Sequence, residues 1–122
     1  MTTALPRIAI VDDSLFVLEA WQQLVDDAEV LVFESPRKFF LATSREPGLL
    51  ASLACVVTDF HFDEGEPLDG TNFAALLVQR CGPPVLLSSD MPYGDEAGSP
   101  FAGRIAKEPM SWMQLARVLR RT

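Results

Sequence analysis

The sequence predicts an α/β domain whose parallel sheet is covered by helices on both faces. Apolar runs of strand length alternate with stretches of helical periodicity along the 122 residues, an order typical of parallel sheets. Two of these runs end directly in carboxylates, at Asp12 and Asp13 and at Asp59, and a third ends in Ser88 and Ser89. Because the carboxyl ends of parallel strands meet at one edge of an open sheet, these side chains are expected to lie together there.

Five short apolar runs predict the strands. They are residues 7–11, 30–33, 55–58, 85–87 and 104–106. Their nearly continuous apolar character is that of strands buried on both faces. The segment 90–100, before the last strand, holds two glycines and two prolines, so a fourth helix there is expected to be short, broken or absent.

Helices are predicted between the strands from start signals, stop signals and periodicity. They are residues 14–26, 36–44, the short turn 49–54, 73–80 and a last helix opening at 111. Ser35 followed by Pro36 is a specific helix start. Asp13 or Ser14 is placed to cap the first helix, which is the alternative to a binding role for Asp13.

The last helix is expected to open with a capping box between Ser111 and Gln114. Its apolar residues recur with helical spacing, which predicts a stripe that faces the sheet. The stripe consists of Trp112, Leu115, Val118 and Leu119.

The composition indicates one domain, residues 1–122, with 48% hydrophobic residues and a net charge of −7. The acidic balance argues against direct binding of nucleic acid, and no apolar run is long enough to insert in a membrane. The amino terminus lacks the pattern of a signal peptide, and Cys55 and Cys81 are expected to be free buried thiols. These features favour a cytoplasmic location.

The three strand-end carboxylates would repel one another if the sheet brings them together. Two unit charges about 4 Å apart repel by roughly 4 kcal/mol at an effective dielectric near 20. A divalent cation relieves that repulsion, and ligation by oxygen alone favours Mg²⁺ or a similar hard ion. Lys107, after the last strand, is placed to add positive charge beside an anion.

The order Asp12-Asp13, Asp59, Ser89, Lys107, each at the end of a predicted strand, resembles the receiver domain of bacterial two-component response regulators. The resemblance covers nearly the whole chain, and residues 60–65 look like the loop of receivers attached to hybrid kinases. It implies a flavodoxin-like three-layer sandwich with a five-stranded parallel sheet in the order 2-1-3-4-5.

The resemblance also implies roles for the acidic residues. Asp59 would be the phosphoacceptor, taking the phosphoryl group from a phosphohistidine on a sensor histidine kinase or phosphotransfer protein. Asp13 and Asp59 would ligate Mg²⁺ through their side chains, the backbone carbonyl of His61 would add a ligand, and Asp12 would act largely through water. The imidazole of His61 is not expected to bind metal.

Ser89 and Lys107 are implied to hold the phosphoryl group. Ser89, rather than Ser88, would hydrogen-bond a phosphoryl oxygen and draw its loop inward, while Lys107 neutralises charge. The resemblance adds no further catalytic residue, so the chain is expected to be a phosphorylation-controlled protein-interaction module that acts on another protein, and not an enzyme.

The sequence departs from the receiver pattern after its fourth strand. Glu108 follows Lys107 where the family usually has proline, which puts the usual cis peptide in question, since a non-proline cis bond costs about 2.5–4 kcal/mol. Arg104 stands where an aromatic switch residue is usual, and Phe101 or Tyr93 would have to replace it. A further departure is an enlarged acidic loop after Asp59. Its acidic residues are Asp63, Glu64, Glu66 and Asp69, in a solvated turn or a partner-selecting loop.

Two other functions remain open at the level of sequence. A degenerate receiver would bind partners without phosphorylation, through the first or the last helix, with Trp21 and the arginines of the last helix as contacts. Those arginines are Arg117, Arg120 and Arg121. A metal-dependent hydrolase would need a general acid/base near Asp59, commonly a carboxylate two residues on, where His61 stands.

Overall fold

The computed structural model describes residues 4–62, 66–89 and 98–121, and in these residues five parallel strands form one sheet in the order β2-β1-β3-β4-β5. The strands are β1 (Arg7–Val11), β2 (Glu29–Phe33), β3 (Leu53–Thr58), β4 (Val85–Ser88) and β5 (Gly103–Ile105). The helices are α1 (Leu15–Leu24), α2 (Pro36–Arg45), the single turn α3 (Leu49–Ser52), α4 (Gly70–Gln79) and α5 (Pro109–Arg121). The predicted α/β fold, with its strand order, is therefore confirmed.

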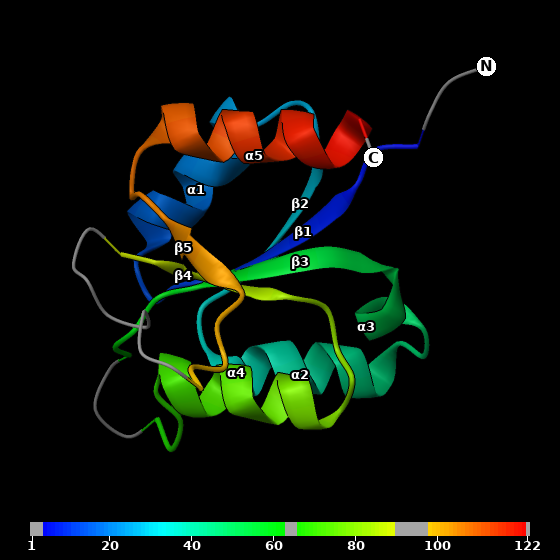
Figure 1. Cartoon of the computed structure of the whole chain (residues 1–122), viewed down its shortest axis with the longest axis vertical. Coiled ribbons are helices and arrows are strands. Elements are labelled where there is room, and N and C mark those ends of the chain that lie inside the picture. The colour runs from blue at the N-terminus through cyan, green and yellow to red at the C-terminus, as the bar shows by residue number, and fades with distance from the viewer. Residues whose placement is uncertain (1–3, 63–65, 90–97, 122) are drawn as a thin grey trace.

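Helices cover the sheet on both faces and so make three layers, with α1 and α5 on one face and α2, α3 and α4 on the other (Figure 1). Alternate residues of the strands point to the two faces, so that in β1 Ile8 and Ile10 join the core under α1 and α5, whereas Ala9 and Val11 join the core over α2 and α4. The start of β1 and the end of α5 lie at the end of the sheet opposite the carboxyl ends of the strands (Figure 1).

The predicted helix starts are confirmed for α1 and α2. Ser14 caps α1 by accepting a hydrogen bond from the amide of Val17 at 3.3 Å, so that Asp13 is not the cap. Ser35 caps α2 in the same way, and Pro36 occupies its first turn. These polar caps set the direction in which each helix leaves the carboxyl edge of the sheet.

The last helix differs from its prediction. It begins at Pro109, which suits a first helical position, so the capping box between Ser111 and Gln114 is wrong: Ser111 lies inside the first turn and donates to Glu108. The expected inner stripe is wrong at Val118, which is 50% exposed, whereas Ala116 is buried in the core.

Smaller differences concern boundaries and one thiol. The first helix ends at Leu24, earlier than predicted. The third strand also begins earlier than predicted, at Leu53, because the turn α3 is only four residues long. β5 lies one residue earlier than expected, since Gly103 pairs with Leu86. Cys55 is buried, and burial raises the pKa of its thiol to about 12, but Cys81 is exposed.

Most of the segment predicted to hold a short or broken fourth helix, residues 90–97, lies outside the described residues, as do Tyr93, Asp63 and Glu64. No cis peptide occurs in the described chain, so the bond between Lys107 and Glu108 is trans. In the same residues, no helix has both the length and the apolar character that crossing a bilayer requires.

Candidate functional site

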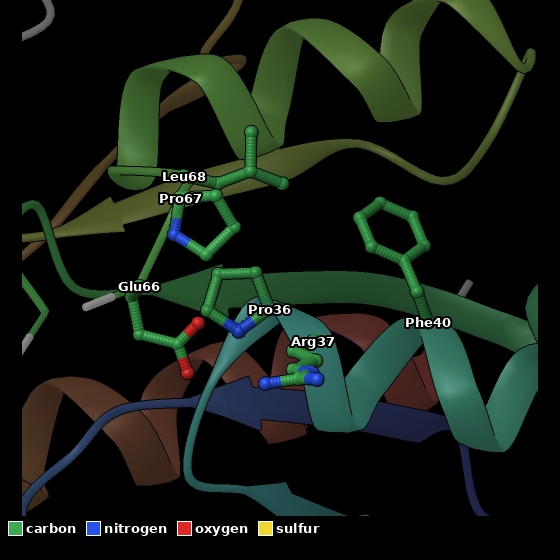
Figure 2. Close-up of a pocket in the computed structure, with 6 residues that line it drawn as sticks. All are labelled: Pro36, Arg37, Phe40, Glu66, Pro67 and Leu68. Atoms are coloured by element: carbon green, nitrogen blue, oxygen red, sulfur yellow. The ribbon is translucent and has the colours of Figure 1, made fainter.

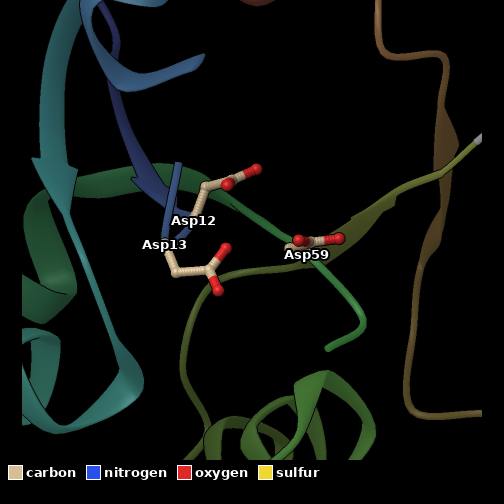
Figure 3. A group of neighbouring side chains, drawn as sticks. All are labelled: Asp12, Asp13 and Asp59. Atoms are coloured by element: carbon tan, nitrogen blue, oxygen red, sulfur yellow. The ribbon is translucent and has the colours of Figure 1, made fainter. Parts of the chain in front are cut away.

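Three carboxylates meet at the carboxyl edge of the sheet, at the ends of the neighbouring strands β1 and β3. Carboxylate oxygens of Asp12, Asp13 and Asp59 all lie within 4.8 Å of one another. Figure 3 shows the three side chains converging from these two strand ends. Val11 and Thr58, the last residues of β1 and β3, pair with each other, so the two strands end side by side. The amide of Asp59 donates a hydrogen bond to the carbonyl of Val11 at 3.0 Å.

Asp12 is the buried member of the group, with 2% of its surface exposed. Its Oδ1 accepts a hydrogen bond from the amide of Ser14 at 2.9 Å. The pKa of Asp12 is raised to about 6, mainly by burial and also by the charge of Asp59, against the lowering effect of the Ser14 hydrogen bond. The ionised site therefore holds more negative charge than its surroundings stabilise, a condition that a bound cation relieves.

Asp59 is partly open to solvent, as is Asp13, and 18% of the Asp59 side chain is exposed. Its Oδ1 accepts two hydrogen bonds, from the backbone amide of Phe60 at 2.9 Å and from Nζ of Lys107 at 3.0 Å. The carboxylate is thus held in one orientation by a rigid backbone donor and by a charged side chain.

Lys107 reaches Asp59 from the short segment between β5 and α5. The preceding residue, Ala106, accepts a hydrogen bond from the indole of Trp112 at 3.2 Å, which fixes the end of this segment to the first turn of α5. The structure therefore brings together four of the predicted site residues, although 48 positions separate Lys107 from Asp59.

The two serines after β4 differ in their surroundings. The amide of Ser89 donates to the carbonyl of Ile105 at 3.2 Å, which places this residue at the same edge of the sheet as the carboxylates. Ser88 is 3% exposed, and its Oγ makes no hydrogen bond with the described protein. A contact between Ser89 and a phosphoryl group remains a prediction.

The loop after Asp59 carries His61, which is exposed and whose ring contacts Phe60 edge-on at 4.5 Å between centroids. Phe60 and Phe62 are partly buried against the core over α2 and α4, so the loop is anchored on both sides of His61. The role of the His61 carbonyl as a metal ligand stays a prediction.

Of the two proposed substitutes for an aromatic switch, Tyr93 lies outside the described residues, and the role of Phe101 stays a prediction. Phe101 is 9% exposed and belongs to the core over α2 and α4, a position that suits a fixed core residue. Arg104 lies exposed on β5.

One functional contact could not be found from the sequence. The amide of Phe60 is a backbone donor to Asp59, and a backbone donor is independent of residue type. The nearest signal is the pair Asp69-Gly70, whose glycine at a helix start indicates a close approach of backbone.

A separate surface pocket of about 530 Å³ lies between the start of α2 and the segment that leads to α4 (Figure 2). Its lining residues are Pro36, Arg37, Phe40, Glu66, Pro67 and Leu68. Because it shares no residue with the carboxylate site, it is not the place of the predicted chemistry.

Solved receiver domains resemble this chain over nearly its whole length, whereas no protein-family model and no curated protein sequence matches it. The signal receiver domain of an HD domain-containing protein from Pseudomonas fluorescens has a TM-score of 0.75 at 14% identity, covering 99% of this chain and 90% of that one. A receiver domain protein from Clostridium thermocellum gives 0.74 at 17%, covering 96% and 95%. A receiver protein from Pseudoalteromonas atlantica gives 0.72 at 20%, covering 95% and 98%. The chain therefore has the fold of the response-regulator receiver domains.

Proposed function

We propose that this chain is a phosphoacceptor receiver of two-component signalling, with Asp59 as the residue that takes the phosphoryl group. One observation carries the proposal: a partly exposed carboxylate lies within 4.8 Å of two others and 3.0 Å from a lysine ammonium. A site that gathers both signs of charge around one carboxylate suits the transfer of an anionic group. The receiver fold of the structural neighbours supports it.

The donor would be a phosphohistidine on a sensor histidine kinase or a phosphotransfer protein. An oxygen of the Asp59 carboxylate attacks phosphorus, so an O–P bond forms as the N–P bond breaks, and the electron pair returns to the imidazole nitrogen of the donor. The product is an acyl phosphate on Asp59. Lys107 then offsets the charge on the phosphoryl oxygens, and Ser89 would donate a hydrogen bond to one of them.

The acidic group also fits Mg²⁺, because its donors are all carboxylate oxygens and burial holds the pKa of Asp12 at about 6. Asp13 and Asp59 would ligate the ion through their side chains, the backbone carbonyl of His61 would add a further ligand, and Asp12 would act largely through water. When bound, the ion would neutralise charge that develops on the transferring group. The Phe60 amide, which donates to Asp59 Oδ1, would keep the carboxylate oriented for the transfer.

The signal would leave this domain through another protein in the cytoplasm, because phosphorylation changes the charge at a surface loop and hence which partners bind there. The net charge of −7 disfavours direct contact with nucleic acid. The exposed Arg104 and the buried Phe101 favour one second candidate, a degenerate receiver that binds its partners without phosphorylation.

Intact mass spectrometry after incubation with acetyl phosphate separates these candidates. The wild-type chain should gain a single phosphoryl group only when Mg²⁺ is present, and Asp59→Ala should gain none. Asp26→Ala is the matched control, since Asp26 is an exposed aspartate outside the acidic group. A wild-type chain that remains unlabelled and does not bind beryllofluoride would favour the degenerate receiver.

A further inference from the structure

Helix α4 begins directly against the backbone of the loop that carries Asp59. The amide of Gly70, the first residue of α4, donates to the carbonyl of Phe60 at 2.8 Å. A Cβ placed on Gly70 would lie 2.2 Å from the carbonyl oxygen of Asp59 and 3.0 Å from Cα of Phe60. Both neighbours are backbone atoms, so no rotation of a side chain could make room for it.

The peptide unit that Gly70 contacts is the one that orients the candidate phosphoacceptor. Its amide, on Phe60, donates to Asp59 Oδ1 at 2.9 Å, and the same oxygen lies 3.0 Å from Nζ of Lys107. On its other side, the carbonyl oxygen of Asp59 accepts a hydrogen bond from Thr58 Oγ1 at 3.0 Å. A displacement of this peptide would therefore carry the carboxylate away from Lys107.

Neither helix formation nor backbone conformation explains a glycine at this position. Alanine favours a helix over glycine, and Gly70 does not have the positive φ that marks Gly48 and Gly98. The start of α4 is nevertheless fixed at this residue, since Asp69 caps the helix by accepting from the amide of Asn72 at 2.8 Å. The close approach to the Asp59 peptide is what requires the missing side chain.

We propose that Gly70 is a positioning residue for the Asp59 carboxylate. Because it has no side chain, the first turn of α4 rests on the Asp59–Phe60 peptide and holds the carboxylate against Lys107 and beside Asp12 and Asp13. The consequence for phosphorylation rests on the proposed function of Asp59. The geometric part concerns the free protein and can be measured without a metal ion or a phosphodonor.

The test compares Gly70→Ala with Gly82→Ala, which lies just beyond the other end of the same helix. A Cβ on Gly82 would lie 3.1 Å from the carbonyl oxygen of Leu77 and does not approach the loop of Asp59. We expect Gly70→Ala to lower the rate of labelling by acetyl phosphate about 10- to 100-fold, since misplacing a reacting group by about 1 Å has an effect of that size. Gly82→Ala should stay within about 2-fold of wild type.

The geometric readout is the backbone amide resonance of Phe60 in the metal-free protein, recorded by ¹⁵N–¹H NMR spectroscopy. Gly70→Ala should shift it, because the hydrogen bond to Asp59 changes, and Gly82→Ala should not. If Gly70→Ala does not fold, Asp69→Ala replaces it. This variant loosens the start of α4 without adding an atom near Asp59, and it should shift the Phe60 amide and slow labelling several-fold.

A Phe60 amide and a labelling rate like those of wild type in Gly70→Ala, or in Asp69→Ala where that variant replaces it, would overturn the inference. An equal loss in Gly82→Ala would also overturn it, because the effect would then belong to the stability of α4. If the wild-type chain takes no phosphoryl group but the Phe60 amide still moves in Gly70→Ala, the proposed function fails and the positioning role stands.

Discussion

Lys107 and Asp59 form a direct ion pair between a basic side chain and the acidic group, with 3.0 Å between Nζ and Oδ1. The pair joins the end of β3 to the segment between β5 and α5, and it is partly open to solvent, with side-chain exposures of 18% for Asp59 and 36% for Lys107. An added phosphoryl group on Asp59 would change the charge that Lys107 faces, so this contact links the site to α5.

Lys107→Ala should leave labelling of Asp59 possible but weaken the structural response to it. Chemical shifts on adding beryllofluoride and Mg²⁺ measure that response, and in the variant they should be confined to residues near Asp59. The free energy of unfolding should fall by less than about 1 kcal/mol, because the pair is partly exposed. Shift changes in the variant that extend into α5 as in the wild type would contradict the prediction.

Asp12→Asn should make the protein more stable at neutral and alkaline pH. The pKa of Asp12 is raised from 3.8 to about 6 in the folded state, so its ionisation has no effect on folding below pH 3.8, lowers stability between pH 3.8 and 6, and leaves the full loss above pH 6. The shift corresponds to at most about 3 kcal/mol. Urea unfolding at pH 4 and pH 8 should show the variant gaining stability only at pH 8.

Added Mg²⁺ tests whether the instability at pH 8 comes from the negative charge of the acidic group. It should stabilise the wild-type protein at pH 8, because the ion neutralises the acidic group, and it should stabilise Asp12→Asn less. If the wild type and Asp12→Asn differed in free energy of unfolding by the same amount at pH 4 and pH 8, ionisation of Asp12 would not be what lowers the stability of the wild type.

Replacement of Trp112 should separate packing from hydrogen bonding under α5. Trp112 is 4% exposed and stacks on Trp21 of α1, with 4.7 Å between ring centroids and 14° between planes. Trp112→Ala should lower the free energy of unfolding by about 3–5 kcal/mol. Trp112→Phe keeps an aromatic ring but loses the bond to the Ala106 carbonyl, and it should lose roughly 1–3 kcal/mol in urea unfolding.

Cys81→Gly should stabilise the protein by about 1 kcal/mol. Cys81 directly follows Arg80, the C-cap of α4, and has a φ of 53°, a left-handed conformation that favours glycine. The amides of Cys81 and Gly82 donate to the carbonyls of Val78 and Leu77, so the turn is fixed by two hydrogen bonds. Cys81→Ala is the control, and chemical denaturation should show little change for it, because alanine keeps the Cβ. A gain in stability in both variants would mean that loss of the thiol, and not the backbone conformation, is the cause.

The strand order was predicted by the resemblance to receiver domains. The meeting of Asp12, Asp13 and Asp59 could be predicted from the sequence pattern alone, because it places a carboxylate at the end of each of two strands. The sequence pattern was sufficient for the start of α2 as well, since Ser35 and Pro36 act locally. Both features depend on short-range chemistry or on the general geometry of parallel sheets.

Other features depend on contacts that sequence patterns do not carry. The prediction of a capping box at Ser111 was wrong because α5 begins two residues earlier, at Pro109, and the Ser111 hydroxyl donates a hydrogen bond to the side chain of Glu108. The left-handed residue just after α4 is Cys81 and not the neighbouring Gly82. The approach of Gly70 to the Asp59 peptide follows from the packing of α4 on the sheet, and it appears only in three dimensions.

The start of β1 and the end of α5 lie at the end of the sheet opposite the carboxyl edge, where the acidic group is (Figure 1). An affinity tag or a fluorescent protein joined ahead of β1 or after α5 would therefore be attached away from Asp59. Immobilisation through either terminus should leave the carboxylates facing the solution, so binding of a candidate partner protein can be measured on a sensor surface in both orientations. The two attachments should give the same affinity for one partner.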